Sequence, residues 1–187
     1  MASWKELRYL VDTKQAICDD SIRDHCGDTC VMLAAGGGHL EVLQYLVDTK
    51  QAICDDSIRT HEGYTCAMVA AYYGHIDVLT YLVNTKQAKC DETIRDNDGM
   101  SCAMVAAQNN QLDILRYLLD EKGCRYDDFV GDDEGQTTYD YAYMNSSTRI
   151  YMEAKIWNTL STIREQCQPF LDDDAVSVIK SFLFKSS

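Results

Sequence analysis

A cysteine followed by two acidic residues occurs three times in the chain, at residues 18–20, 54–56 and 90–92. Thiolates and carboxylates are zinc ligands, so each copy could in principle hold a metal ion. The copies are 36 residues apart, however, and residues 9–23 reappear letter for letter as residues 45–59. A metal or catalytic centre is normally assembled once, whereas a string that is copied at a fixed offset indicates a structural unit.

Three of the other six cysteines follow the same period. Cys30, Cys66 and Cys102 are also 36 residues apart, so six of the nine cysteines occupy two positions of the repeating unit. Neighbouring helices pack roughly 10 Å apart, which is too far for thiolates of successive copies to share one tetrahedral zinc ion. We therefore predict free, reduced thiols and no bound metal. The same interpretation covers the group His25, Cys26 and Cys30, because Cys30 falls on a repeat position.

Three glycines at residues 36–38 precede a helical pattern and superficially suggest a phosphate-binding loop. They lack the strand in front and the Lys-Ser/Thr behind that give such a loop its mechanism, so we interpret them as a turn between helices. The histidines pair by register, His25 with His61 and His39 with His75, which favours a loop role over that of a catalytic base. No Gly-x-Ser-x-Gly motif occurs. We predict no catalytic residue, no cofactor and no enzymatic activity.

The chain is strongly acidic. It carries 30 acidic and 17 basic residues, a formal net charge of −13. Such a field repels nucleic acid and attracts a basic protein surface or peptide, or it serves solubility alone. No stretch approaches the roughly 18 apolar residues of a membrane span, and the first residues lack the features of a secretory signal. We expect a cytoplasmic protein, with nuclear entry left open, that is a monomer or weak oligomer and has no membrane partner.

An internal period of this length predicts a solenoid of stacked units. Apolar residues such as Leu40, Leu43 and Val47 recur at three- and four-residue spacing, which predicts an amphipathic helix that must share its core with neighbouring copies. The units that we predict are a half repeat at 1–23, full repeats at 24–59, 60–95 and 96–131, and the start of a degenerate fourth at 132–147.

Each unit resembles an ankyrin repeat. The features that carry the resemblance are a turn glycine, a Thr or Ser two positions later that can cap the first helix, a pair of alanines, and Gly-His before the second helix. They stand at Gly27, Gly63, Gly99 and Gly135; at Thr29, Thr65, Ser101 and Thr137; at 34–35, 70–71 and 106–107; and at 38–39 and 74–75.

The units also depart from the family pattern. Cysteine replaces the proline and methionine replaces the histidine of the family's Thr-Pro-Leu-His motif, and the period is three residues longer than the usual length of about 33. The resemblance implies an all-α fold, an ankyrin-type α-solenoid of helix-loop-helix repeats over residues 1–147. It also implies a non-catalytic scaffold that binds a partner protein or peptide through its concave face and loops.

In the family, the residues around the turn and at the end of the first helix form the contact surface. These positions differ between the copies, which indicates that stacking does not require them. The resemblance places the following residues there: His25, Cys26, Asp28, Gly36 and Gly37; His61, Glu62, Tyr64, Tyr72 and Tyr73; Asn97, Asp98, Met100, Gln108 and Asn109; Asp133, Glu134, Gln136, Met144 and Asn145. Tyr64, Tyr72 and Tyr73 stand out, because clustered tyrosines are common in binding hot spots. The alternative is that one or two of them pack against the next unit.

The period stops before residues 148–187. Ile150, Ala154 and Trp157 begin an apolar face that predicts one long helix ended by Pro169. A shorter amphipathic helix is expected after it, so that this segment forms a helical cap or extension of the array. At the other end we expect Trp4 to cover the first half repeat, unless the chain is a fragment of a longer array.

The C-terminal segment also supports an alternative function. Residues 169–183 loosely resemble the opening of an F-box-like segment, in which a proline precedes a short apolar helix. In that case the chain would be a target-recruiting adaptor, of the ubiquitin-ligase type or a host-interaction effector, whose C-terminal helices dock other machinery.

Overall fold

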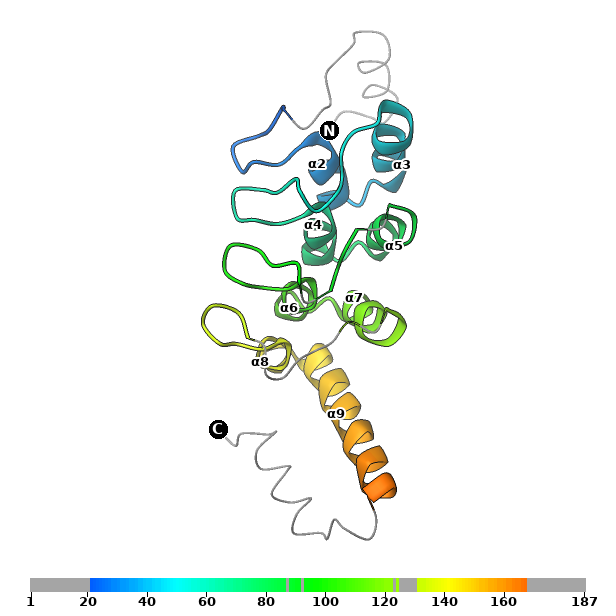
Figure 1. The fold of residues 1–187 in the computed structure, drawn as a ribbon, viewed down its shortest axis with the longest axis vertical. Coiled ribbons are helices and arrows are strands. Elements are labelled where there is room, and N and C mark those ends of the chain that lie inside the picture. Colours follow the sequence, from blue (N-terminus) through cyan, green and yellow to red (C-terminus); the bar gives the residue numbers. More distant parts are fainter. Residues whose placement is uncertain (1–20, 87, 92, 123, 125–130, 168–187) are drawn as a thin grey trace. The chain divides into compact units, whose positions relative to one another are not determined.

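The computed structural model describes residues 21–86, 88–91, 93–122, 124 and 131–167. Within these ranges the chain forms helices joined by loops and turns, without a β-strand. The helices stack as an all-α repeat solenoid, as the sequence predicts (Figure 1). The chain divides into two compact units between Arg149 and Ile150, and the described repeats lie in the first unit.

Each repeat begins with a short helix whose start is fixed by a hydroxyl side chain. The hydroxyls of Thr29, Thr65 and Ser101 each accept a hydrogen bond from the backbone N–H three residues on, which satisfies a donor that the helix itself leaves unpaired. Thr137 does the same in the fourth repeat. The predicted caps are therefore confirmed. The first helices are α2 (Cys30–Gly36), α4 (Cys66–Tyr73), α6 (Cys102–Gln108) and α8 (Thr138–Tyr143).

The second helices run antiparallel to the first and are slightly longer. Two of them end in a π-helical turn, in which the backbone bonds widen by one residue. Figure 1 shows them as a row beside the first helices. They are α3 (Leu40–Gln44) with η1 (Tyr45–Thr49), α5 (Ile76–Thr85), and α7 (Leu112–Arg116) with η2 (Tyr117–Glu121).

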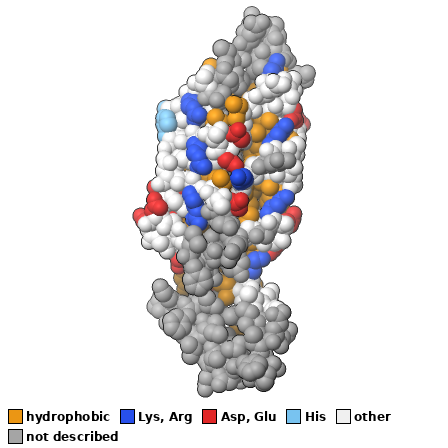
Figure 2. Space-filling view, in the orientation of Figure 1, with side chains coloured by type: hydrophobic (Ala, Val, Ile, Leu, Met, Phe, Trp, Pro, Cys, Tyr) orange, Lys and Arg blue, Asp and Glu red, His pale blue; other side chains and the backbone are white. Residues whose placement is uncertain are grey.

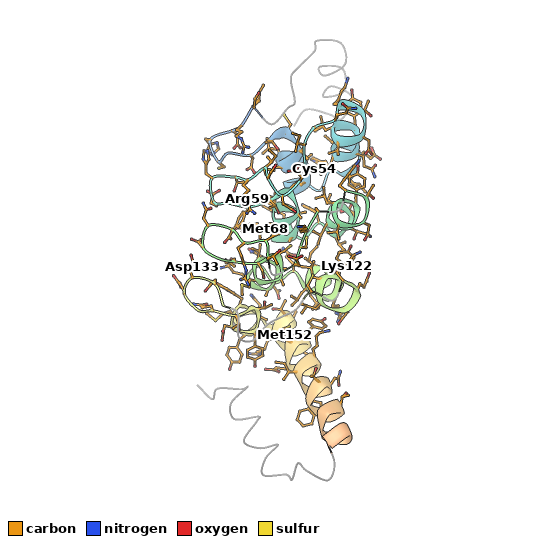
Figure 3. All side chains as sticks on the ribbon, viewed as in Figure 1. Cys54, Arg59, Met68, Lys122, Asp133 and Met152 are labelled. Atoms are coloured by element: carbon orange, nitrogen blue, oxygen red, sulfur yellow. The ribbon has the colours of Figure 1, made fainter. Side chains whose placement is uncertain are left out.

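The core is built from the residues that are the same in each copy. The first helix has almost no exposed side: Cys66 to Ala71 are all buried in α4, because this helix is covered by α5 and by the first helices before and after it. Alanine pairs allow the helices to approach closely, and the methionines Met32, Met68 and Met104 fill the space between them. Met68 is labelled in Figure 3. No single repeat could cover these side chains, so stacking supplies the core.

The loops that precede the first helices form a row that we call the fingers, residues 24–28, 60–64, 96–100 and 132–136. Adjacent fingers are joined by one backbone hydrogen bond each, from His61 N to Cys26 O, from Asn97 N to Glu62 O, and from Asp133 N to Asp98 O. In Figure 1 the fingers lie side by side. This ladder holds successive repeats in one register.

Glycine is required where adjacent fingers meet. Gly63 has φ +88, and a Cβ there would lie 2.7 Å from the backbone nitrogen of Asn97 in the next finger. An alanine would therefore be strained twice, by its own left-handed backbone and by the neighbouring chain. The turn glycines of the other fingers share the positive φ. The predicted role of these glycines is confirmed.

An arginine precedes each of the first three fingers, and two of these arginines add a second link between repeats. Arg59 Nη1 donates to Gly63 O in its own finger at 2.8 Å and to Arg95 O of the next repeat at 2.6 Å. Arg23 makes the same pair of bonds one repeat earlier, to Gly27 O and Arg59 O. Because the guanidinium donates to two carbonyls at once, it ties the base of one finger to the next.

A third link caps the C-terminal carbonyls of the first helices. His75 Nε2 lies 2.9 Å from Gly36 O, and Gln111 Nε2 donates to Tyr72 O at 3.1 Å. Both residues stand just before a second helix, and each reaches back to the previous repeat. His75 thus has a structural contact, in agreement with the loop role predicted from the repeat register.

A fourth set of links joins the second helices. Tyr81 and Lys86 both donate to Asp48 of the previous repeat, and Tyr117 and Lys122 both contact Asn84 in the same way. Each lysine also lies over the ring of the tyrosine beside it, at 5.8 Å for Lys86 and Tyr81. Figure 2 shows the basic side chains in columns along the repeats, with acidic side chains between them.

The long helix α9 (Ser146–Cys167) is present, but its buried face differs from the predicted one. Ile150, Ala154 and Trp157 are exposed, whereas Thr148, Met152 and Ile156 are buried. The Thr148 hydroxyl donates to Ala142 O, and the other two buried residues follow it at four-residue steps along one side of the helix. The predictions for Trp4 and for the segment after Pro169 concern residues outside the described ranges.

Exchanging Gly63 for alanine tests the close approach of the fingers, and Gly135 is the matched control. Both residues have positive φ, so alanine strains the backbone of each by about 1 to 2 kcal/mol. At Gly135, however, a Cβ meets no described heavy atom within 4 Å. We expect Gly63→Ala to lower the free energy of unfolding in urea by about 2 kcal/mol more than Gly135→Ala does. Equal losses would mean that the contact between fingers does not constrain the stack.

Candidate functional site

The positions that differ between repeats line the fingers and the C-terminal ends of the first helices. At the second finger position the side chain is exposed in all four repeats, and at the third it is exposed in three. The residues concerned are His25, His61, Asn97 and Asp133, and then Glu62, Asp98 and Glu134; Cys26 is half-buried. The backbones of these residues form the finger ladder while most of their side chains point to solvent. This part of the surface is therefore free to vary without loss of the stack.

The three tyrosines of the second full repeat lie together, but they are not equivalent. Their rings form a chain, with centroids 6.1 Å apart for Tyr64 and Tyr72 and 4.9 Å apart for Tyr72 and Tyr73. Tyr73 is 59% exposed, whereas Tyr64 and Tyr72 are half-buried against Met100 and its neighbours in the next repeat. Packing thus holds two rings, and only Tyr73 is mostly free.

Met100 is buried, although the sequence predicted it on the contact surface. Its side chain is only 4% exposed and packs with Met104 and Val105. The rings of Tyr64, Tyr72 and Tyr141 pack against the cluster that contains Met100 and help to cover it. Gln136, at the same position of the fourth repeat, is exposed. Met100 is therefore a packing residue, and we remove it from the contact surface.

The ends of the first helices expose different groups in successive repeats. Gln108 is exposed, and Met144 is 83% exposed, which is unusual for an apolar side chain of this size. The neighbouring asparagines have structural contacts: the Asn109 amide donates to Val105 O, and the Asn145 amide donates to Ala107 O and Gln108 O. Asn145 thereby links the fourth repeat to the third.

Aspartate side chains stabilise the turns of the fingers by hydrogen bonds and also give the fingers negative charge. Asp96 Oδ1 accepts the backbone N–H groups of Asp98 and Met100, and Asp132 Oδ1 accepts those of Glu134 and Gln136. Such bonds mimic a backbone turn. Burial raises the pKa of the Asp96 carboxyl, although these hydrogen bonds oppose the shift. Periodic aspartates before the glycine signal this role in the sequence, but the sequence analysis did not identify it.

A second residue that the sequence analysis missed is Tyr141. It stands where the earlier repeats have an aliphatic residue, Val105 or Val69, and that exchange is the signal that could have identified it. Its ring packs against the cluster of Met100, Met104 and Val105, and its hydroxyl donates to Asp132. Tyr141 therefore packs, from the fourth repeat, on the same apolar cluster that Tyr64 and Tyr72 contact from the second.

Asp24, His25 and Cys26 form the one group among the described residues whose spacing could suit a metal ion, with ligand atoms within 4.8 Å of one another. Asp24 Oδ1 already accepts the N–H groups of Cys26 and Asp28, so it holds the turn as Asp96 does. The equivalent fingers place other residue types beside that carboxylate. The turn therefore accounts for this group without a metal.

The described cysteines carry free thiols, and two of them are deeply buried. Cys66 is 1% exposed and donates toward Val31 O of the previous repeat at 3.9 Å. Burial raises the pKa of the Cys66 thiol well above its usual value. Hydrogen bonding with Cys90, together with burial, raises the pKa of Cys102. Both thiols are therefore protonated packing groups at neutral pH.

Comparison with known families agrees with this geometry. A model for ankyrin repeats in three copies matches residues 3–93, and a model for a single ankyrin repeat matches residues 98–128. No curated protein matches the chain. No helix of the described part of the chain is long and apolar enough to cross a membrane.

Single alanine substitutions separate packing from exposure in the tyrosine cluster. Tyr72→Ala removes a ring that covers the Met100 cluster, and we expect the free energy of unfolding to fall by about 2 kcal/mol, a loss of roughly 4 to 8 °C in Tm. Tyr73→Ala, the control on the same helix, should change Tm by no more than about 2 °C. Thermal denaturation followed by circular dichroism measures both. A larger loss for Tyr73→Ala would place the packing role on that ring instead.

Thiol labelling tests the assignment of the cysteines. The thiolate is the reactive form, so raised pKa values and burial should leave Cys66 and Cys102 unlabelled by iodoacetamide at about pH 8 in the folded protein. In urea without reductant, all nine cysteines should react, and native mass spectrometry should detect no zinc. Rapid labelling of Cys66 in the folded state, or a cysteine that stays blocked after unfolding, would contradict the assignment.

Proposed function

The chain belongs to the ankyrin-repeat family, and from that membership we propose that it is a non-catalytic scaffold that binds a partner protein. Ankyrin repeats are in general protein–protein interaction modules. The proposed partner engages the fingers and the C-terminal ends of the first helices. The negative net charge favours a partner with a basic surface or peptide.

One observation carries the proposal: the first-helix residues that are alike in the repeats are buried, while the residues of the fingers and helix ends that differ are mostly exposed on one surface. Thr65, Met68 and Ala71 are representative of the first group, and each is at most 1% exposed. His61, Glu62 and Tyr73 are representative of the second. Repeats that were retained for stacking alone would have no physical reason to place their differences together on that surface.

The exposed apolar groups on this surface support the same proposal. Tyr73 and Met144 both lie at the C-terminal end of a first helix, and both expose more than half of their side chains. Aromatic residues and methionine are enriched at protein interfaces, where they fill pockets of the partner. The contact residues that we propose are His61, Glu62, Tyr64, Tyr72, Tyr73, Asp98, Gln108, Asn109, Gln136, Met144 and Asn145.

The adaptor alternative has no observation in its favour. It depends on residues 169–187 as a docking segment, and these lie outside the described ranges. We therefore restrict the proposal to the binding of a partner by the repeats.

Site-specific photo-crosslinking tests the proposal. A benzoylphenylalanine placed at Tyr73 or at Gln108, in cells that express the protein, should give a discrete covalent adduct with a partner. The controls are the same probe at Ile53, which is exposed in the loop after the second helix, and at Asp77, which is exposed on α5. Absence of adducts at Tyr73 and Gln108, or identical adducts at all four positions, would refute binding through the contact surface.

A further inference from the structure

An aromatic surface with apolar support spans the second, third and fourth repeats. Tyr64, Tyr72 and Tyr141 are partly buried and pack against the cluster of Met100, Met104 and Val105. The three rings come from different elements, namely a finger and the helices α4 and α8. Because the rings are held by packing, they keep their positions without a ligand. This is the preorganisation that lowers the cost of binding.

Carboxylates surround the same rings. Glu62 and Asp98 are exposed on neighbouring fingers, and Asp132 accepts the hydroxyl of Tyr141. The carboxylate of Asp96 acts electrostatically on both Tyr64 and Tyr141. Several negative groups therefore converge on one aromatic surface.

The carboxylate of Asp96 is a second and independent observation, because only one of its two oxygens accepts hydrogen bonds. The residue is only 8% exposed, and its Oδ2 is buried without a hydrogen-bond partner among the described residues. An unpaired buried carboxylate oxygen destabilises the fold, because it has lost its hydrogen bonds to water without forming one within the protein. A cation that binds beside it would recover part of that cost.

The carboxylates also act on the pKa of the Tyr64 hydroxyl. Burial, followed by the charges of Asp96, Tyr72, Asp98 and Glu62, raises its pKa to about 12. Burial disfavours a charge of either sign, so only the carboxylates among these causes bear on a cation. Their negative charge opposes the phenolate and attracts a positive group.

Aromatic rings beside carboxylates bind an arginine side chain better than a lysine, acidic or apolar one. A guanidinium is planar, stacks on aromatic faces, and donates in a fork that matches a carboxylate. A lysine ammonium holds its water more tightly and lacks the flat face. An acidic or phosphate group would be repelled, and a purely apolar side chain would leave the carboxylates unpaired.

We propose that the surface of Tyr64, Tyr72 and Tyr141, with the carboxylates of Glu62 and Asp98, receives an arginine side chain from a basic segment of the partner. The inference rests on the proposed function, because the arginine must be presented by a protein that binds the repeats. It deepens that function by naming the chemistry of recognition. The exposed Tyr73 and Met144 then contact other parts of the same segment.

A fluorescein-labelled hepta-arginine peptide is the probe, with binding measured by fluorescence anisotropy at about 150 mM salt, where distant charges are screened. The site variant combines Glu62→Gln with Asp98→Asn. The matched control combines Glu41→Gln with Asp113→Asn, two exposed acids on the second helices that change the net charge equally. Glu62 and Asp98 contribute backbone atoms to the finger ladder while their side chains are exposed, so we expect both variants to fold with the same Tm.

We expect the site variant to weaken hepta-arginine binding at least about tenfold, and the control less than about twofold. Hepta-lysine should bind the unmodified protein several-fold more weakly than hepta-arginine, since lysine gains less from the rings. Equal weakening by the two variants would mean that only the general field attracts the peptide, which overturns the proposal. Equal affinity for hepta-lysine would overturn the choice of arginine.

The crosslinking experiment keeps this inference separate from the proposed function. If the adduct at Tyr73 survives in the variant with Glu62→Gln and Asp98→Asn at the same yield, the arginine site fails while protein binding stands. If the unmodified protein gives no adduct at Tyr73 or Gln108, the proposed function itself fails. Loss of the adduct in the site variant, with retention in the control variant, supports both.

Discussion

The close contact between each finger and the turn of the repeat before it is the constraint on which the rest of the array depends. A backbone N–H of one finger donates to a carbonyl of the previous finger, and the turn glycine lies directly beneath it. Only a residue without a side chain and with a left-handed backbone fits there. The arginine beneath the finger and the side-chain cap on the end of the first helix then join the same two repeats in the same register. Each junction is therefore specified several times, although no repeat could form a core alone.

This arrangement explains why the chain can repeat its structural residues and vary its surface. The finger ladder uses backbone atoms, so it places few demands on the side chains at the finger tips. The buried helices use a constant set of small and flexible apolar residues, which pack in the same way at each junction. Exposed polar and aromatic side chains are then free to differ between repeats. The candidate binding surface follows from this division between constant backbone contacts and variable side chains.

Much of the fold could be predicted from the sequence, because the signals were local and repeated four times. A Thr or Ser two residues after a glycine predicted both a turn and a helix cap, and both are present at Thr65 and Gly63. The contact residues were harder, because exposure depends on what the next repeat places opposite. Met100 and Gln136 share a position, yet the first is buried and the second exposed. Tyr72 is likewise half-buried by residues that lie about one repeat later, and no pattern within its own helix shows this.

The division between constant and variable residues can be measured directly by exchanging contact residues between two repeats. A chain with His61→Asn, Glu62→Asp and Tyr73→Asn carries in its second full repeat the residues of the third, at the same net charge. We expect Tm to change by no more than about 2 °C, while the adduct from a crosslinker at Gln108 is lost or changes its partner. A large fall in Tm would show that these side chains belong to the stack. An unchanged adduct with unchanged Tm would show that they take no part in recognition, and either result would contradict the division.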